Sequence, residues 1–281
     1  MTGGNGQLGS EFKTIGADYP HFDITFTDLP ELDLTDENAL HSYFEHHGFD
    51  VVINCAAYTA VDKAETEIEK AFSVNRDVVK SLVNICNQTD CYLVHISTDY
   101  VFDGKSGRPY REDDAPNPQS VYGRSKHAGE EAMADCLIPG LIVRTSWLYS
   151  SFGINFTKTI LQKARERNEL RVVSDQFGSP TYARDLANTL LTILPKAISE
   201  QNLHILHYSN EGICSWYEFA REIIAIAGLS CEVRPITTAE YPVAAARPAY
   251  SVLDTSLVRD RFGIEIPDWR DGLRRCLMEL L

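Results

Sequence analysis

Short apolar runs rich in β-branched residues alternate with longer amphipathic runs through the first half of this chain. Such alternation is typical of a parallel sheet whose strands are joined by crossover helices. The predicted strands are Ile24–Asp28, Val51–Cys55, Tyr92–Ser97 and Leu141–Thr145. The predicted helices between them are Glu37–His46, Ile68–Asn87 and Tyr122–Ala134. The sequence therefore predicts an α/β fold with a Rossmann-like, doubly wound parallel sheet.

After about residue 150 the pattern becomes mainly helical. The predicted helices there are Asn155–Arg167, Tyr182–Ile193, Trp216–Ala227 and Trp269–Leu281. Short predicted strands lie at Leu170–Val173, Leu203–Tyr208 and Cys231–Arg234. We expect a dinucleotide-binding domain at residues 1–150. Residues 151–281 are expected to form mainly a smaller substrate-binding lobe, with segments that return to the first domain.

Composition excludes several classes of protein. With 281 residues and 44% hydrophobic content, the chain can bury a sizeable core. No apolar run approaches the roughly 20 residues of a membrane span. A net charge of −14 argues against nucleic acid or an anionic membrane as a partner. The seven cysteines are odd in number and scattered, as expected for reduced thiols in a cytoplasmic protein.

The chain opens with a glycine-rich segment in which Gly3, Gly6 and Gly9 are spaced three residues apart. Such glycines permit a tight turn and a close approach of backbone to a pyrophosphate, whose charge the next helix would stabilise. An ordinary turn is the alternative interpretation of these glycines taken alone. Asp28, at the end of the next predicted strand, could bind an adenosine ribose hydroxyl and would favour NAD over NADP.

The glycine segment begins directly after Met1, although in this fold it should follow a buried strand at the middle of the sheet. Losing about five apolar residues at roughly 2 kcal/mol each would rival the 5–15 kcal/mol stability of a domain. We therefore expect Met1 to be an internal start, or residues to be missing before it. We also expect poor binding of a nicotinamide cofactor unless another segment fills the empty slot.

Tyr122 and Lys126 lie four residues apart, on one face of a predicted helix. A phenol has a pKa near 10, and a nearby lysine cation would lower that pKa towards the range useful for proton exchange. Thr98 follows an apolar strand, where its hydroxyl could bind a substrate carbonyl. The alternatives are a solvated helix pair for Tyr122 and Lys126, and a simple strand end for Thr98.

Taken together, these segments resemble the extended short-chain dehydrogenase/reductases and, more narrowly, the dTDP-4-dehydrorhamnose reductases. The resemblance rests on Gly3–Gly9, Asn54–Asp62, Ser97–Phe102, Tyr122–Lys126, Arg144–Trp147, and Arg247-Pro248 with Ser251 and Asp254. It implies reduction of the C4 ketone of a nucleotide-linked 6-deoxy sugar by NADPH or NADH. It also brings magnesium as a family association that no residue here locates, so no metal ligand is predicted.

The resemblance also implies the role of each site residue. Tyr122 would donate the proton, Thr98 would bind the carbonyl, and Lys126 would lower the pKa of Tyr122 and hold the nicotinamide ribose. The substrate residues would be Thr98, Asp99, Trp147 and Arg247. The cofactor residues would be Gly3, Gly6, Gln7, Leu8, Asp28, Asp33, Leu34, Ala56, Ala57, Tyr58, Thr59, Tyr122 and Lys126.

Other functions remain open at this point. One rival is another sugar-nucleotide-modifying enzyme of this fold, a 4,6-dehydratase or an epimerase. Such dehydratases carry a glutamate where this chain has Tyr100, and an unperturbed phenol suits that chemistry poorly. A non-catalytic regulatory subunit, of the kind that binds methionine adenosyltransferase, shares the fold. Trp147 could be ordinary core packing, and Arg247 a surface loop residue. The sequence leaves the oligomer open, with a homodimer as the state considered.

Overall fold

The structure, a computed structural model, describes residues 1–136 and 138–281. Its centre is a parallel sheet of four named strands in the order β1-β2-β3-β8. The strands are β1 (Val51–Asn54), β2 (Tyr92–Thr98), β3 (Gly140–Thr145) and β8 (Leu203–Tyr208). Register places Asn54 opposite His95, and Thr98 opposite Thr145, so the carboxyl ends of the strands meet at one edge.

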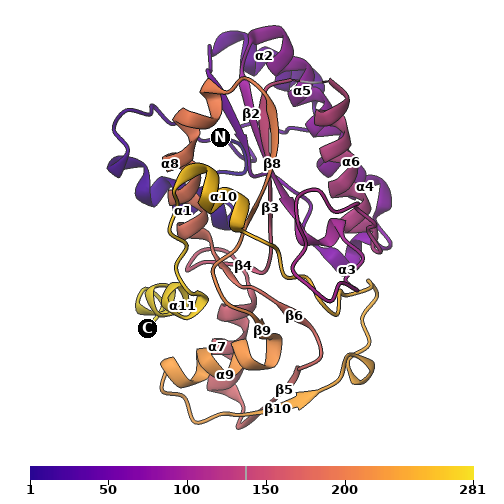
Figure 1. The fold of residues 1–281 in the computed structure, drawn as a ribbon, viewed down its shortest axis with the longest axis vertical. Coiled ribbons are helices and arrows are strands. Elements are labelled where there is room, and N and C mark those ends of the chain that lie inside the picture. Colours follow the sequence, from indigo (N-terminus) through magenta and orange to yellow (C-terminus); the bar gives the residue numbers. More distant parts are fainter. Residues whose placement is uncertain (137) are drawn as a thin grey trace.

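Helices cover both faces of this sheet (Figure 1), which confirms the predicted α/β class. One face packs against α1 (Gln7–Ile15), α8 (Ala183–Ser199) and α10 (Ser256–Phe262). The other packs against α2 (Glu37–His46), α5 (Val78–Thr89) and Met133 of α6 (Val121–Cys136). Successive strand residues point to opposite faces. Leu141 and Val143 accordingly join the first core, while Ile142 joins the second.

The predicted helix Ile68–Asn87 is interrupted by a π-helical turn. It consists of α4 (Ile68–Phe72), the π turn Ser73–Asp77 and α5. The turn places the buried Asn75 amide against the main chain of Tyr58, with its Oδ1 2.8 Å from the Tyr58 nitrogen. π turns occur often at functional sites, and this one supports the segment that follows β1.

A third core lies below the sheet in Figure 1. It is formed by α7 (Phe156–Glu166), α9 (Trp216–Ile226) and α11 (Trp269–Met278), with the parallel pair β5 (Glu169–Val173) and β10 (Glu232–Ile236). The remaining short elements are α3 (Val61–Ala64), β4 (Leu148–Tyr149), β6 (Phe177–Gly178), β7 (Thr181–Tyr182), β9 (Cys214–Ser215), and 3-10 turns at Gly16–Asp18, Asp99–Val101 and Thr238–Glu240. None of the helices in the described ranges has the length and hydrophobicity to cross a membrane.

The segment predicted as a strand at Ile24–Asp28 does not form one. It is extended, but its only bridge is a parallel one between Thr27 and Thr2. The reason is that the neighbouring segment, with which it would form a ladder, is too short. Met1 and Thr2 supply only two residues between this segment and β1, and a ladder needs a longer partner.

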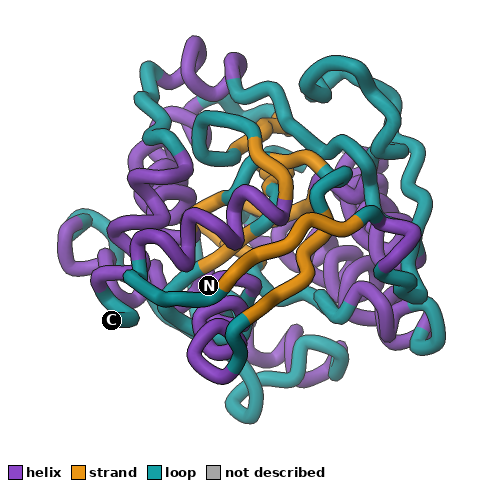
Figure 2. The backbone as a smooth tube through the Cα atoms, turned by 90° about the horizontal axis from the view of Figure 1, so that it is seen from below, coloured by secondary structure: helices purple, strands orange, loops and turns teal. Residues whose placement is uncertain are grey.

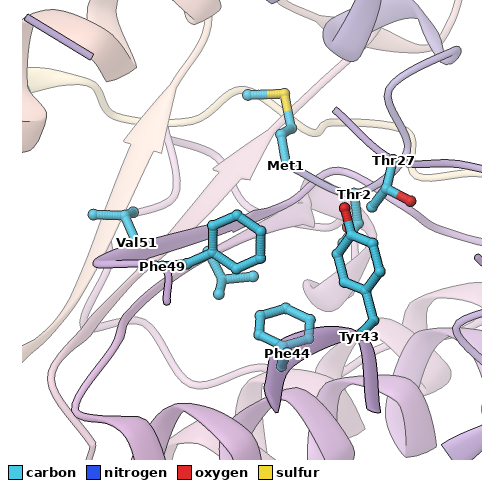
Figure 3. A pocket seen from close by; sticks show the side chains of 8 residues that line it. Met1, Thr2, Thr27, Tyr43, Phe44, Phe49 and Val51 are labelled. Atoms are coloured by element: carbon cyan, nitrogen blue, oxygen red, sulfur yellow. The ribbon is translucent and has the colours of Figure 1, made fainter. Parts of the chain in front are cut away.

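Those two residues nevertheless occupy the end of the expected slot, beside the central strands (Figure 2). Thr27 N–H donates to Met1 O (2.9 Å), Thr2 N–H to Ile53 O (3.0 Å), and Cys55 N–H to Thr2 O (3.3 Å). The glycine segment is therefore anchored on both sides. A small hollow lies below Met1 (Figure 3), next to Thr27 on one side and β1 on the other. Its lining includes Tyr43, Phe44, Phe49 and Val51.

We predict that adding Ile-Leu-Val before Met1 will stabilise the protein, because the added residues can pair with both walls and cover this apolar hollow. A gain of a few kcal/mol would raise Tm by on the order of 5–10 °C. It should also tighten the binding of a nicotinamide cofactor by steadying the glycine segment. Thermal unfolding of a matched Gly-Ser-Asn extension is the control, and equal Tm values for both extensions would contradict the prediction.

Candidate active site

The carboxyl ends of the parallel strands bring four segments of the chain to one edge of the sheet. The glycine segment lies there, together with Cys55–Thr59 after β1, Asp99 and Tyr100 after β2, and Ser146-Trp147 after β3. Ligands of open α/β sheets bind at this edge. The candidate site is therefore built where the topology favours one.

The glycine segment forms a tight turn that opens α1. Gly3 has φ +67°, and its carbonyl accepts a hydrogen bond from Gly6 N–H at 3.1 Å. A Cβ on Gly9 would lie 2.3 Å from Gly3 O, so no other residue fits there. Because α1 begins at Gln7 without a side-chain cap, the main-chain amides of Gln7 and Leu8 are left free at the end of this turn.

Among the predicted cofactor residues Asp28, Asp33 and Leu34, Asp28 lies beside this turn, because its Oδ2 accepts from Asn5 N–H at 2.8 Å. The other two make different contacts. Asp33 accepts from the Thr35 amide (2.9 Å) and hydroxyl (2.6 Å), and these bonds lower the pKa of its carboxyl. Leu34 packs at the margin of the core formed by α2 and α5. A cofactor role for Asp33 and Leu34 stays a prediction.

Ala56, Ala57 and Tyr58 follow β1 and are partly exposed, and Thr59 is exposed. Ala56 lies against Gly3, since a Cβ on Gly3 would meet the Ala56 nitrogen at 2.7 Å. The Tyr58 hydroxyl donates to Glu67 at 3.1 Å. This segment therefore lines the side of the glycine turn, as a cofactor wall would.

Thr98, Asp99 and Tyr122 lie together at the end of β2. The Thr98 hydroxyl donates to Asp99 Oδ1 at 3.0 Å and accepts from Tyr100 N–H at 3.2 Å. Burial raises the pKa of the Tyr122 phenol, and a hydrogen bond with Thr98 acts in the opposite direction. The ring of Tyr122 meets that of Tyr100 edge-on, with centroids 5.5 Å apart.

Lys126 is buried behind these residues. Its Nζ donates to Ile96 O at 2.6 Å and lies 3.1 Å from His95 Nε2. Burial lowers the pKa of Lys126 to about 8, while Glu130 and Cys55 oppose the shift. In this structure the pKa of Tyr122 is raised, and the expected lowering by Lys126 is not seen. The lysine is engaged by His95 and a main-chain carbonyl, and burial dominates the phenol.

Asp99 is the most unusual carboxylate of the site. It is 3% exposed, and its Oδ2 has no hydrogen-bond partner within the described part of the chain. Burial raises its pKa to about 6, although the hydroxyls of Ser251 and Thr98 act in the opposite direction; the Ser251 hydroxyl, like Oδ2, has no partner within hydrogen-bond distance among the described residues. A buried carboxylate oxygen without a partner is costly, so it is a natural place for a substrate hydroxyl.

Trp147 has φ +47°, an uncommon backbone conformation for a bulky residue. Its indole stacks on Trp216 with centroids 3.5 Å apart and planes 7° from parallel. Gly178 supports the other side, because a Cβ there would lie 2.5 Å from the indole. Strained backbone of this kind clusters at functional sites, and here two neighbours hold the ring in place.

Arg247 reaches the site from the carboxy-terminal half of the chain. Its guanidinium donates to Asp62 Oδ2 at 2.6 Å and to Tyr100 Oη at 3.0 Å. It also lines a hollow with Lys105, Gln119 and Phe102. Arg247 is thus placed to meet an anionic group.

Sequence reasoning missed the buried polar groups behind the site. Glu130 of α6 binds Arg144 of β3 through two nitrogens, with a shortest distance of 2.7 Å, and also accepts from Ser97 Oγ at 2.5 Å. All three side chains are buried. The signal was an arginine and a histidine, Arg144 and His95, inside runs otherwise read as apolar strands.

The doubly wound sheet with a glycine turn at its carboxyl edge defines a Rossmann-type protein, in which Thr98, Tyr122 and Lys126 lie at or behind that edge. The family described as RmlD substrate binding domain matches residues 1–281. The chain therefore belongs to the dTDP-4-dehydrorhamnose reductase family, which confirms the resemblance drawn from its sequence motifs.

Several relatives match over nearly their whole length. The dTDP-4-dehydrorhamnose reductase of Aggregatibacter actinomycetemcomitans is 39% identical, over 98% of this chain and 96% of that one. The crystal structure of such a reductase from Clostridium acetobutylicum is 40% identical with a TM-score of 0.93, covering 99% and 98% of the two chains. That of the Bacillus anthracis reductase, in complex with NADP, is 38% identical with a TM-score of 0.91, covering 99% and 97%.

We predict that Asp99→Asn will stabilise the protein at high pH. The raised pKa of Asp99 gives a contribution to stability that is present below pH ~4 and is lost as the pH rises through about 6. The stability of the variant relative to the parent should therefore rise by on the order of 2 kcal/mol between pH 4 and pH 8, measured by urea unfolding.

Asp103→Asn is the matched control, because a hydrogen bond from Tyr110 lowers the pKa of Asp103. The relative stability of that variant should stay nearly constant between pH 4 and pH 8 and rise only below pH ~4. A pH-independent difference for Asp99→Asn would show that Asp99 titrates normally in the folded protein.

Proposed function

We propose that this protein reduces the C4 ketone of dTDP-4-dehydro-6-deoxy-L-mannose (dTDP-4-dehydrorhamnose) with NADPH or NADH, giving dTDP-L-rhamnose. It is an oxidoreductase of nucleotide-sugar biosynthesis. The observation that carries the proposal is the meeting of Thr98, Asp99 and Tyr122 at the carboxyl edge of the sheet, next to the glycine turn. The names of its full-length relatives support the same reaction.

The site residues divide the work as follows. The bound nicotinamide would supply a hydride to C4. Tyr122 would give its proton to the carbonyl oxygen, and the Thr98 hydroxyl would hold that oxygen as negative charge develops on it. Asp99 would accept a sugar hydroxyl on its free Oδ2, and Trp147 would form a wall of the sugar pocket.

The cofactor would lie across the glycine turn. Amides at Gly6, Gln7 and Leu8 would hold the pyrophosphate, with Gly3 giving it room, and Asp28 would face the adenosine ribose. Ala56, Ala57, Tyr58 and Thr59 would line the middle of the cofactor. The charge of Asp28 predicts that the protein prefers NADH over NADPH. The crystal structure of the Bacillus anthracis relative contains NADP.

Arg247 would bind the diphosphate of the nucleotide sugar. Its two present partners, Asp62 and Tyr100, hold the guanidinium at the hollow lined by Lys105 and Gln119. A guanidinium pairs well with phosphate oxygens. We also propose the division of the chain near residue 150, with α8 and β8 returning to the nucleotide-binding sheet.

The competing functions fit less well. Where a dehydratase of this fold carries a glutamate, this chain has Tyr100, whose hydroxyl accepts a hydrogen bond from Arg247 at 3.0 Å. The assembled Thr98, Asp99 and Tyr122 set also disfavours a purely regulatory subunit. We propose a homodimer in the cytoplasm. Among the described residues all seven cysteines are free and five are buried, as a reducing compartment favours.

The direct test is oxidation of reduced nicotinamide by the protein with dTDP-4-dehydrorhamnose as substrate. We predict that Tyr122→Phe will lower kcat by on the order of 10²–10⁴ and leave cofactor affinity nearly unchanged, because the ring stays while the proton donor is lost. The readouts are the loss of reduced-nicotinamide absorbance and a cofactor titration. Turnover close to that of the parent would remove Tyr122 from the mechanism.

Thr98→Val keeps the shape of the side chain but deletes the hydroxyl that would face the carbonyl. We predict a loss of about 10²-fold or more in kcat, the usual effect of one hydrogen bond to developing charge. Thr98→Ser restores the hydroxyl and should recover most of the activity. An inactive serine variant beside an active valine variant would refute the role.

A further inference from the structure

Lys126 has no carboxylate as a direct partner among the residues that the structure describes. The side chain is 1% exposed, and the two groups nearest its Nζ are Ile96 O and His95 Nε2. A lysine cation has three hydrogens to donate and nothing with which to accept. If His95 Nε2 carries a lone pair, it can accept a hydrogen from the lysine cation. If it carries a hydrogen, only the neutral amine of the lysine can accept it.

The tautomer of His95 follows from its other neighbour. His95 Nδ1 lies 3.1 Å from Asn54 Nδ2. The orientation of the Asn54 amide is fixed by its far side, because Ala56 N–H can only donate and lies 3.2 Å from Asn54 Oδ1. The Thr2 hydroxyl donates to the same oxygen at 2.8 Å. Asn54 Nδ2 therefore faces His95 and donates to Nδ1.

A histidine that accepts at Nδ1 carries its single proton on Nε2. His95 is fully buried, and burial together with Lys126 lowers its pKa well below the ordinary value, so it stays neutral. Its Nε2–H then points at Lys126 Nζ across 3.1 Å. An ammonium group cannot accept this hydrogen, but a neutral amine can.

We propose that His95, with its tautomer fixed by Asn54, is a positioning residue that donates Nε2–H to the neutral amine of Lys126 and so makes Lys126 a proton donor near neutral pH. This inference rests on the proposed reduction. When Tyr122 gives its proton to the ketone, a phenolate remains. The Lys126 ammonium would resupply that proton, which leaves the neutral amine that His95 stabilises, and a later protonation of the amine would complete the cycle.

The other groups around Lys126 fit this assignment. Glu130, one turn further along α6, opposes loss of the lysine proton, but its charge is held by Arg144 and Ser97. Cys55, after β1, stays a neutral thiol because burial raises its pKa to about 12. Burial itself lowers the pKa of Lys126 to about 8, in the direction that the donated hydrogen of His95 reinforces.

The first experiment is NMR of the parent protein and needs no substrate. Long-range ¹⁵N–¹H correlation spectra identify the tautomer of each histidine, and loss of one set of signals in His95→Gln assigns His95. We expect the Nε2–H form from pH 6 to pH 9. In ¹⁵N-lysine spectra we expect Lys126 to lose its proton at least two pH units below the ordinary value of about 10.4.

The second experiment reverses the hydrogen-bond chain with one substitution. In Asn54→Asp a carboxylate still accepts from Thr2 and Ala56 but can only accept from His95, which must then carry its proton on Nδ1. Nε2 becomes an acceptor for the lysine cation. We expect the Nδ1–H tautomer, a rise in the pH at which Lys126 titrates, and a kcat lower by on the order of 10-fold with little change in the KM for cofactor.

Thr2→Val is the matched control, because Ala56 alone still orients the Asn54 amide; it should keep the Nε2–H tautomer. An Nδ1–H tautomer or an ordinary lysine titration in the parent protein would overturn the inference, even if Asn54→Asp fails to fold. A parent protein with the expected spectra but no reductase activity would refute the proposed function and leave the tautomer standing. An active reductase in which His95 carries its proton on Nδ1 would refute the tautomer inference and leave the proposed function standing.

Discussion

The buried ion pair between Glu130 and Arg144 fixes the helix that carries the chemistry. It joins α6 to β3, and through Ser97 it also joins α6 to β2, one residue before Thr98. Removing one partner of such a pair leaves an unpaired buried charge, which typically costs 3–5 kcal/mol. Tyr122 and Lys126 thus approach the carboxyl edge of the sheet at a distance set by a rigid polar contact rather than by apolar packing alone.

The edge of the sheet beside this ion pair holds several other buried polar groups. Asn54, His95, Asp99 and Lys126 are all buried at or behind the ends of β1 and β2. A buried polar group is tolerated when it is hydrogen-bonded, and each of these except Asp99 has its side chain satisfied by a neighbour. The oxygen left without a partner among the described residues, Oδ2 of Asp99, belongs to the residue that follows Thr98 at the end of β2, so the cost falls at the candidate site.

Sequence patterns could predict the sheet and most helices, because period and turn chemistry are local properties. Glu37–His46 and Leu203–Tyr208 were predicted with the bounds that the structure has. The strand at Ile24–Asp28 failed because strand formation depends on a partner, which a single segment cannot reveal. The helix at Tyr182–Ile193 runs on to Ser199 past Pro195, since burial of its apolar face outweighs the proline.

For the site, the residues could be predicted from the sequence, but their electrostatics could not. Thr98, Asp99 and Tyr122 could be brought together by motif, and the structure places them in contact. Their electrostatics could not be predicted, because a pKa depends on neighbours from other elements. A lysine four residues from a tyrosine suggested a lowered phenol pKa, yet His95 and the Ile96 carbonyl engage that lysine instead.

Thr2 links the two least predictable parts of the molecule. Its main chain closes the slot between the Thr27 segment and β1, while its hydroxyl begins the chain of side chains through Asn54 and His95 to Lys126. Hydrogen bonds in a low-dielectric interior polarise one another, so a shift at one end is felt at the other. The glycine turn starts at the next residue, Gly3. A ligand that orders this turn therefore acts directly beside the residue that closes the slot next to β1.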